Sequence, residues 1–318
     1  MTALYPYLDP RRVGRLTSTD AAAVLGLSRW RGAIDVQERM RAELAGKPYA
    51  RKELGGPDIE RGTYLEPGIL AWTGQRLGRT TQPGRFEVHR LHPWLGSSND
   101  GFTLGDQERL VEIKCPRRDD GWGDEGTDEI PDHYLAQVMV EMAVFEVSAD
   151  VVLFVHGDIR IYPVERDIEA ETELINALDN WRIRHVVHGE PVPVDGTAAY
   201  GEHLARRFAA HSDAMRQATV ESRRWMAQLR EARALAAKAE ELELEARNHL
   251  CAEIGDAQGI ACPIDGWRVT WKETKGTRKT NWQDVASECH VPQEVIERHT
   301  RIVGGGRRFL PKFTKEDK

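Results

Sequence analysis

The sequence has no long hydrophobic run and no closely paired cysteines, and both absences narrow the possible functions. No stretch of 18 apolar residues occurs in the 318-residue chain, so we expect no membrane-spanning helix. The N-terminal residues MTALYPYLDPRR lack the apolar stretch of a signal peptide, which favours a cytoplasmic protein. The four cysteines form no CxxC pair, which argues against zinc and iron–sulfur sites.

The chain also lacks the net positive charge that many nucleic-acid-binding proteins carry. Its formal net charge is -7 at pH 7, so an overall basic footprint is absent. The charges are nevertheless segregated, because residues 10–34 contain five arginines against one aspartate, whereas acidic residues collect in 119–132. Carboxylates for a metal and basic groups for phosphate can occur together, so this mixed pattern is compatible with an enzyme that acts on nucleic acid.

Hydrophobic periodicity predicts an α/β domain over residues 1–190. The predicted helices cover 17–26, 33–45, 59–77, 131–146 and 167–188, and the predicted strands cover 84–90, 95–104, 108–114, 149–156 and 158–165. Pro67 should kink or divide the third helix, and a Gly-Asp turn should join the second and third strands. This order of elements indicates a mixed central sheet flanked by helices.

Two further regions are predicted after the proline- and glycine-containing segment 191–196. Residues 197–255 carry apolar side chains every three or four positions, which indicates a long amphipathic helix or a helical hairpin. A single rod of 49 residues would span roughly 75 Å. Residues 260–318 are expected to form a small basic α+β module containing a β-hairpin.

The hairpin expected in this last module combines tryptophans with basic side chains. We interpret its charged residues as possible DNA contacts. These residues are Arg268, Lys272, Lys275, Arg278 and Lys279. The alternative is a solvated hairpin whose tryptophans pack on the preceding helices.

The strongest chemical signal comes from Asp100, Glu112 and Lys114. Glu112 and Lys114 lie two positions apart on a predicted strand, so both should project from one face, with Ile113 facing the core. Phosphodiester hydrolysis needs an activated water and stabilisation of charge at phosphorus, which carboxylate-bound Mg²⁺ supplies. The pattern suggests a metal-dependent nuclease site, and the alternative is an exposed ion pair on an edge strand.

Two residues on predicted helices add to this cluster. Glu66 lies beside Pro67 on an apolar helix and is a candidate third metal ligand, although a solvent-facing glutamate is the alternative. Gln137 follows Tyr134 by three positions, so its amide could position the attacking water or a phosphate. The alternative for Gln137 is a partly buried amide hydrogen-bonded to the backbone.

Taken together, these residues resemble the motifs of a known nuclease family. The similarity is to the λ exonuclease and the YqaJ-type viral recombinases of the PD-(D/E)xK superfamily, over roughly residues 10–190. It is carried by Glu66, Ser98-Asn99-Asp100-Gly101, Glu112-Ile113-Lys114 and Tyr134-Leu-Ala-Gln137. Asn99 stands where the family usually has a proline before the first aspartate.

The resemblance implies a DNA exonuclease that uses Mg²⁺, with Mn²⁺ as a possible substitute. It assigns catalysis to Asp100, Glu112, Lys114 and Gln137, and metal binding to Glu66, Asp100, Glu112 and the carbonyl of Ile113. The enzyme would digest one strand of duplex DNA from its end, 5′ to 3′. It would pass the exposed strand to a single-strand annealing protein, and it would act in a bacterial or phage-infected cell.

The resemblance also implies a binding site for the 5′-phosphate of a DNA end and a homotrimer. The DNA-binding residues would be Arg12, Thr19, Ser98 and Tyr134. An arginine forms paired hydrogen bonds with phosphate, and a helix N-terminus attracts anions. Ordinary helix capping is the alternative for the hydroxyl residues at 17–19.

Two other functions remain open at this point. The chain could be an endonuclease of the same superfamily, of the restriction or Cas-associated type, or a non-catalytic protein that binds DNA ends or serves as a scaffold. The lack of a cysteine cluster argues against the iron–sulfur Cas-associated type. Intact Asp100, Glu112 and Lys114 argue against a site that has lost its activity.

Overall fold

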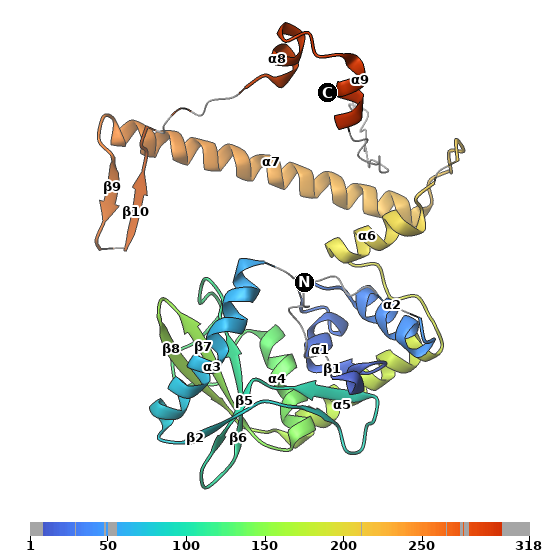
Figure 1. Cartoon of the computed structure of the whole chain (residues 1–318), viewed down its shortest axis with the longest axis vertical. Coiled ribbons are helices and arrows are strands. Elements are labelled where there is room, and N and C mark those ends of the chain that lie inside the picture. The colour runs from blue at the N-terminus through green and yellow to red at the C-terminus, as the bar shows by residue number, and fades with distance from the viewer. Residues whose placement is uncertain are drawn as a thin grey trace. The chain divides into compact units, whose positions relative to one another are not determined.

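The computed structural model describes residues 9–28, 30–47, 49, 56–210, 212–264, 266–273, 276 and 280–300. The chain divides into two compact units, Met1–Ala209 and Ala210–Lys318, each of which is considered by itself. Figure 1 shows a unit of mixed sheet and helices, and a second unit dominated by one long helix. Three of the predicted DNA contacts, Lys275, Arg278 and Lys279, lie outside the described residues.

The first unit is built on a mixed five-stranded sheet in the order β2-β5-β6-β7-β8. Its strands are β2 (Thr80–Pro83), β5 (Gly101–Leu104), β6 (Arg109–Lys114), β7 (Ala149–Val155) and β8 (Asp158–Val164). Strands β6 and β7 pair in parallel and the other neighbours pair antiparallel. A parallel pair needs a crossover connection, which contains helix α4 (Asp132–Phe145). The predicted α/β class with a mixed sheet is confirmed.

A second sheet corrects the predicted single strand at 95–104. Strands β1 (Leu16–Thr17), β4 (Leu95–Ser98) and β3 (Phe86–Val88) form a separate sheet in the order β1-β4-β3. The chain leaves β4 at Ser98 and enters β5 of the larger sheet at Gly101. The side chain of the buried Asn99 stabilises this break. Its Nδ2 donates to the Gly101 carbonyl, and its Oδ1 accepts from the backbone amide of Arg85 at 3.2 Å.

Helices α3 (Pro57–Leu77) and α4 contribute side chains to hydrophobic clusters on opposite faces of the five-stranded sheet. On one side, Ile69 and Leu70 of α3 pack in a cluster with Ile113 of β6. On the other, Val138 and Met142 of α4 pack in a cluster that includes Leu110 of β6 and alternate residues of β7. Strand β6 is therefore covered on both faces.

Helix α3 runs through Pro67 without ending, so of the two expectations for Pro67, a kink or a division of the helix, the division is wrong. A proline inside a helix cannot donate a backbone hydrogen bond to the residue four positions earlier. The helix continues because Ile69 and Leu70, immediately after the proline, are buried against the sheet. Tertiary packing thus outweighs the local preference of one residue.

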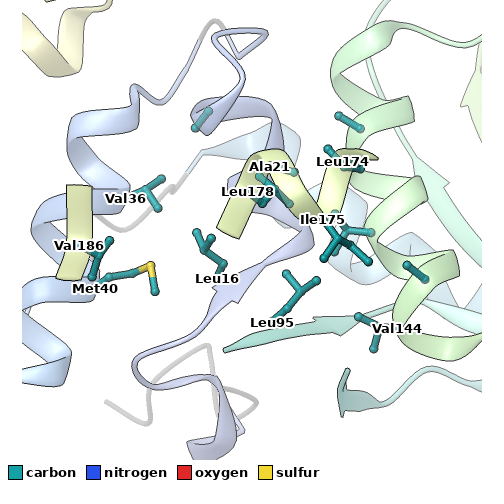
Figure 2. Packing of buried hydrophobic residues seen from close by; sticks show 14 residues of the cluster. Leu16, Ala21, Val36, Met40, Leu95, Val144, Leu174, Ile175, Leu178 and Val186 are labelled. Atoms are coloured by element: carbon teal, nitrogen blue, oxygen red, sulfur yellow. The ribbon is translucent and has the colours of Figure 1, made fainter. Parts of the chain in front are cut away.

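A helical core surrounds the smaller sheet. It combines α4 with helices α1 (Ser18–Val24), α2 (Ala33–Leu44) and α5 (Ile168–Trp181), the last continued by a π-helical turn, η2 (Arg182–Val187). Figure 2 shows Leu16 and Leu95, from β1 and β4, among side chains of these helices. This core attaches the N-terminal segment, including the 3-10 turn η1 (Pro10–Arg12), to the rest of the unit.

The predicted long helix is shorter than expected and starts later. Helix α6 (Ala198–Arg207) is separate and packs its Tyr200 with Ile34 of α2. The long helix itself, α7 (Val220–Ile254), has 35 residues and starts at a Thr219 cap whose hydroxyl accepts from the Ser222 amide. Because Ala198–Arg207 packs on the first unit, the apolar repeat at 197–255 is divided between two helices.

The C-terminal module contains a hairpin that lies earlier than the one expected over residues 268–279, part of which lies outside the described residues. Strands β9 (Gly259–Cys262) and β10 (Trp267–Thr270) pair antiparallel, and helices α8 (Trp282–Glu288) and α9 (Gln293–His299) follow. Arg268 lies on β10, whereas Lys272 lies beyond its end. Among the described residues of both units, no helix is long and apolar enough to cross a membrane.

Candidate active site

Glu112, Lys114 and Gln137 form a closed hydrogen-bonded triangle. Lys114 Nζ donates to Glu112 Oε1 at 2.6 Å and to Gln137 Oε1 at 3.0 Å. Gln137 Nε2 donates to the same Glu112 Oε1 at 2.6 Å. Strand alternation puts the first two side chains on the α4 side of β6, and one turn of α4 supplies the third. The triangle is largely enclosed, with Glu112 fully buried and 14% of the Lys114 side chain exposed.

Asp100 lies next to this triangle, at the break between the two sheets. Its Oδ2 accepts from the Ile113 amide at 2.6 Å, and its own amide donates to the Val111 carbonyl at 3.2 Å. These bonds hold the carboxylate against β6. Desolvation, reinforced by Glu112 and Glu66, raises the pKa of Asp100 well above its usual range.

Glu66 approaches the same site from α3. It is half-buried, and desolvation together with the charge of Glu112 raises the pKa of its carboxyl group. Helix α3 therefore brings Glu66 toward the strand that carries Glu112. The solvent-facing alternative for Glu66 does not describe its position.

The carboxylates determine the protonation state of Lys114. Burial by itself would lower the pKa of this ammonium group, but Glu112 and Asp100 outweigh burial and raise the pKa above its usual value. Lys114 is consequently a cation that donates hydrogen bonds. Its Nζ also lies 4.9 Å from the centre of the Tyr134 ring, which further stabilises the charge.

Two glycines allow the backbone around Asp100 to pack closely. A Cβ atom at Gly84 would lie 1.8 Å from the Asn99 carbonyl oxygen, and one at Gly101 would lie 2.5 Å from a methyl group of Leu70. The Gly84 amide donates to the Asp100 carbonyl at 3.0 Å. No other residue type fits these two positions without displacing the turn that carries Asp100.

Glu141 completes the site and was missed in the sequence analysis. It lies one helical turn after Gln137 on α4, is fully buried, and accepts from Gln137 Nε2 at 2.9 Å. Its second oxygen is buried and has no hydrogen-bond partner in the part of the chain that the structure describes. Desolvation, reinforced by the charge of Glu112, raises the pKa of Glu141 well above its usual range. The spacing of four from Gln137 was the signal available in the sequence.

The predicted phosphate-binding residues lie in two groups. Arg12 donates to Ser98 Oγ at 2.6 Å, which connects the N-terminal segment to the strand end two residues before Asp100. The exposed Thr19 contacts the Thr17 hydroxyl at 3.1 Å. Thr17 caps α1 together with Asp20, as the capping alternative predicts. The structure thus brings Arg12 and Ser98 into direct contact, whereas Thr19 contacts Thr17.

A buried ionic network supports the segment that carries Arg12, and sequence reasoning did not identify it. Asp20 is 1% exposed and binds Arg39 at 2.7 Å and Arg31 at 2.9 Å. Arg39 also binds Glu43 at 2.8 Å and the Arg15 carbonyl at 3.1 Å. The partners lie up to 24 positions apart along the sequence, and local periodicity gives no indication of such pairs.

The donor set around Asp100 suits a hard divalent cation. Asp100, Glu112 and Glu66 bring their negative charges close together, and burial together with this repulsion raises the pKa values of Asp100 and Glu66. Mg²⁺ favours such carboxylate oxygens. As the side chains stand, the described part of the chain contains no group of three or more His, Cys, Asp or Glu residues arranged around one point. Glu112 instead bonds to Lys114 and Gln137, so the carboxylates would have to turn toward a shared ion.

The comparison with protein families gives one match. Residues 7–148 match the family described as the YqaJ-like viral recombinase domain. This match confirms the family resemblance that the motifs predict. It includes Asp100, Glu112, Lys114 and Gln137, which all lie within the matched residues.

Solved structures also resemble this chain, at low sequence identity. An alkaline exonuclease (LHK-Exo) from Laribacter hongkongensis is 20% identical, with a TM-score of 0.46 and coverage of 62% of this chain and 95% of that one. A phage-related exonuclease from Haemophilus somnus 129PT is 14% identical, with a TM-score of 0.41 and coverage of 55% and 96%. No curated protein matches the chain.

Proposed function

We propose, from the YqaJ-like viral recombinase domain carried by residues 7–148, that this chain is a metal-dependent exonuclease acting on the ends of duplex DNA. The observation that carries the proposal is the triangle of Glu112, Lys114 and Gln137 beside the carboxylate of Asp100. Carboxylates that can hold a divalent cation, beside a cation that can donate to a water, suit metal-assisted phosphodiester hydrolysis.

The acidic residues are assigned to the metal. Asp100, Glu112 and the Ile113 carbonyl would hold a Mg²⁺ ion, with Glu66 as a further ligand, and Mn²⁺ could replace it. When bound, the ion would stabilise the charge that develops on the phosphate and lower the pKa of a bound water. Burial of these carboxylates, with their mutual repulsion, raises the pKa values of Asp100 and Glu66, and a bound cation would offset both effects, which supports the assignment.

Lys114 and Gln137 are assigned to the attacking water. Because the pKa of Lys114 is raised, its ammonium group orients the water by donating a hydrogen bond and does not remove its proton. The Gln137 amide presents its oxygen toward Lys114 and its nitrogen toward Glu112. It therefore keeps Lys114 and Glu112 at fixed positions relative to the water.

Arg12 and Ser98 are assigned to the DNA end. The Arg12–Ser98 hydrogen bond of 2.6 Å lies two residues from Asp100 in the sequence, which supports a phosphate position close to the metal ligands. An arginine at this position could pair with a terminal 5′-phosphate. Thr19 and Tyr134 are further candidates, and Arg268 and Lys272 remain candidates for separate DNA contacts in the second unit. The wider proposal is that the enzyme digests duplex DNA from 5′ to 3′ and passes the exposed strand to an annealing protein. It also includes assembly of the chain as a trimer.

A comparison of DNA forms tests the function. Purified protein with Mg²⁺ is incubated with end-labelled linear duplex, with and without a 5′-phosphate, and with closed circular DNA of the same sequence. We expect release of mononucleotides from the linear duplex, loss of this activity in EDTA, and no cleavage of the circle. Equal digestion of the circle would identify an endonuclease. Binding without cleavage in Mg²⁺ and in Mn²⁺ would identify a DNA-end-binding protein.

A further inference from the structure

Helix α7 exposes an unusually large apolar surface for a helix of its length. Ile254 is the one buried residue among the 35 residues of α7. The exposed fractions are 55% for Trp225, 65% for Leu235 and 53% for Leu242. An extended apolar surface of this kind marks an interaction site.

The apolar positions of α7 follow the seven-residue repeat of a coiled coil. Seven positions alternate in steps of four and three residues, with Glu243 interrupting them once, and these spacings define a continuous stripe along one side of the helix. The stripe consists of Trp225, Leu229, Ala232, Ala236, Ala239, Ala246 and Leu250. A repeat of 3.5 residues fits a helix that pairs with another helix, whereas packing on a globular surface needs no such regularity.

The charges on α7 are divided between its two halves. Residues 220–238 contain five Lys/Arg and two Asp/Glu, whereas residues 239–254 contain five Asp/Glu and one Arg. A partner helix in the same direction would put basic against basic and acidic against acidic. A second α7 in the opposite direction would put each basic half against an acidic half, which lowers the electrostatic energy of the pair.

We propose that α7 associates with α7 of a second copy of this chain as an antiparallel coiled coil centred between residues 237 and 238, a two-fold contact that is separate from any three-fold contact between the nuclease units. In this register Trp225 lies opposite the partner's Leu250, and Ala236 lies opposite the partner's Ala239. Every large side chain of the stripe then meets an apolar side chain, and the small residues lie at the centre. Glu243 meets the partner's Ala232, which leaves room for the carboxylate to reach solvent.

The positions on either side of the stripe support the same register. On one side, Arg233 and the partner's Glu240 lie two residues from direct alignment, about 3 Å along the helix axis, which is within reach of an ion pair, and the two-fold symmetry gives two such pairs. On the other side, Leu235 and the partner's Leu242 are offset by the same two residues, so their side chains can cover two of the most exposed leucines of the helix. Shifting one helix by seven residues would separate Arg233 from the partner's Glu240 and Leu235 from the partner's Leu242. One antiparallel register therefore satisfies the stripe, the charges and the flanking leucines together.

Charge reversal tests the association at two positions, 233 and 240, that are exposed on α7. The full-length chain is compared with Arg233→Glu, Glu240→Arg and the double variant by sedimentation equilibrium at low salt. Each single variant creates two like-charge pairs, and we expect the dimer dissociation constant to rise about tenfold. The double variant restores opposite charges and should recover the affinity of the unchanged chain. Failure of the double variant to recover it would overturn the register.

Cross-linking tests the direction of the helices. In a background with Cys251, Cys262 and Cys289 replaced by Ser, chains carrying Leu229→Cys are mixed with chains carrying Ala246→Cys and oxidised. We expect a disulfide-linked dimer from the mixture, and little from either variant alone. Efficient cross-linking of Leu229→Cys by itself would show parallel helices and overturn the proposal.

Two further outcomes would also overturn it. One is a chain that stays monomeric up to the highest concentration examined. The other is an assembly whose mass responds to none of the α7 variants, which would locate the contact elsewhere or show that α7 packs on its own chain. Because these measurements need no DNA, they are independent of the proposed nuclease activity.

Discussion

The side-chain amide of Gln137 has only one favourable orientation because Glu141 accepts its Nε2 proton at 2.9 Å. The other Nε2 proton is donated to Glu112 at 2.6 Å, and Oε1 faces the ammonium group of Lys114. A reversed amide would direct its oxygen at two carboxylates and its protons at a cation. Glu141 is therefore a positioning residue for the proposed reaction, although it does not itself face the substrate.

The first prediction concerns this hydrogen bond. Glu141→Leu should lower kcat about 10- to 100-fold, because a misplaced group near the reacting atoms costs this much, while KM for DNA changes little. Glu141→Gln keeps an acceptor at the same place and should retain most of the activity. The measurement is steady-state digestion of 5′-phosphorylated duplex, with circular dichroism to check folding. Equal losses in both variants would contradict the orienting role.

The second prediction concerns the pH dependence of stability. The pKa of Asp100 is raised in the folded chain, so the folded state holds this proton more tightly than the unfolded state. The contribution of Asp100 to the free energy of unfolding is neutral below the unfolded pKa of about 4. It becomes unfavourable to the folded state as the pH rises above that value. Asp100→Asn removes the group, so the variant should be more stable than the unchanged chain in EDTA, by a margin that grows from pH 4 to pH 8.

Thermal unfolding at several pH values checks this expectation. Each kcal/mol of gained stability should raise Tm by about 2–4 °C for a unit of this size. Asp195→Asn is a suitable control, since Asp195 is exposed and lies far from the site in the sequence. A margin that stays constant with pH, or that shrinks toward pH 8, would argue against the buried-carboxylate explanation.

The third prediction concerns Lys114. Lys114→Ala should abolish cleavage, because nothing then orients the water, while binding to duplex ends persists. Removing the lysine also leaves Glu112 without its 2.6 Å ion pair, so folding must be checked beside activity. Filter binding in Ca²⁺ separates binding from catalysis. Full activity of this variant would mean that the reaction occurs elsewhere.

The fourth prediction concerns the DNA end. Arg12→Ala should reduce the preference for 5′-phosphorylated over 5′-hydroxyl duplex by about tenfold, which corresponds to about 1.4 kcal/mol for a lost charge-assisted hydrogen bond. The matched control is Arg90→Ala, an exposed arginine whose side chain pairs with Glu146. The ratio of initial rates on the two substrates is the readout. An unchanged ratio would remove Arg12 from phosphate recognition.

The fifth prediction concerns the glycine beside Asp100. Gly84→Ala places a Cβ atom against the Asn99 carbonyl and should destabilise the first unit by about 3 kcal/mol, as overpacking does. Gly68→Ala, in the middle of α3 where a Cβ meets nothing, should instead stabilise it by about 1 kcal/mol. Urea unfolding of both variants gives the comparison. A neutral Gly84→Ala would mean that the turn adapts.

Much of the site follows from the sequence alone. The alternation of β6 puts Glu112 and Lys114 on one face and Ile113 on the other. The three-residue step from Tyr134 to Gln137 puts both near Lys114 from one helix. These relationships are local, because the helical and strand repeats fix the direction of neighbouring side chains whatever the rest of the chain does.

The tertiary structure decided the relationships between distant residues. Three of them depend on which surfaces are buried together. These are the change of sheet at Asn99, the approach of α3 that brings Glu66 toward Glu112, and the Asp20–Arg39 ion pair. Glu141 was missed because a glutamate on a helix is ordinarily exposed, and only its burial beneath Gln137 gives it a role. Burial of a charged group is a property of the packed core, where desolvation and neighbouring charges act together, and local periodicity carries no record of it.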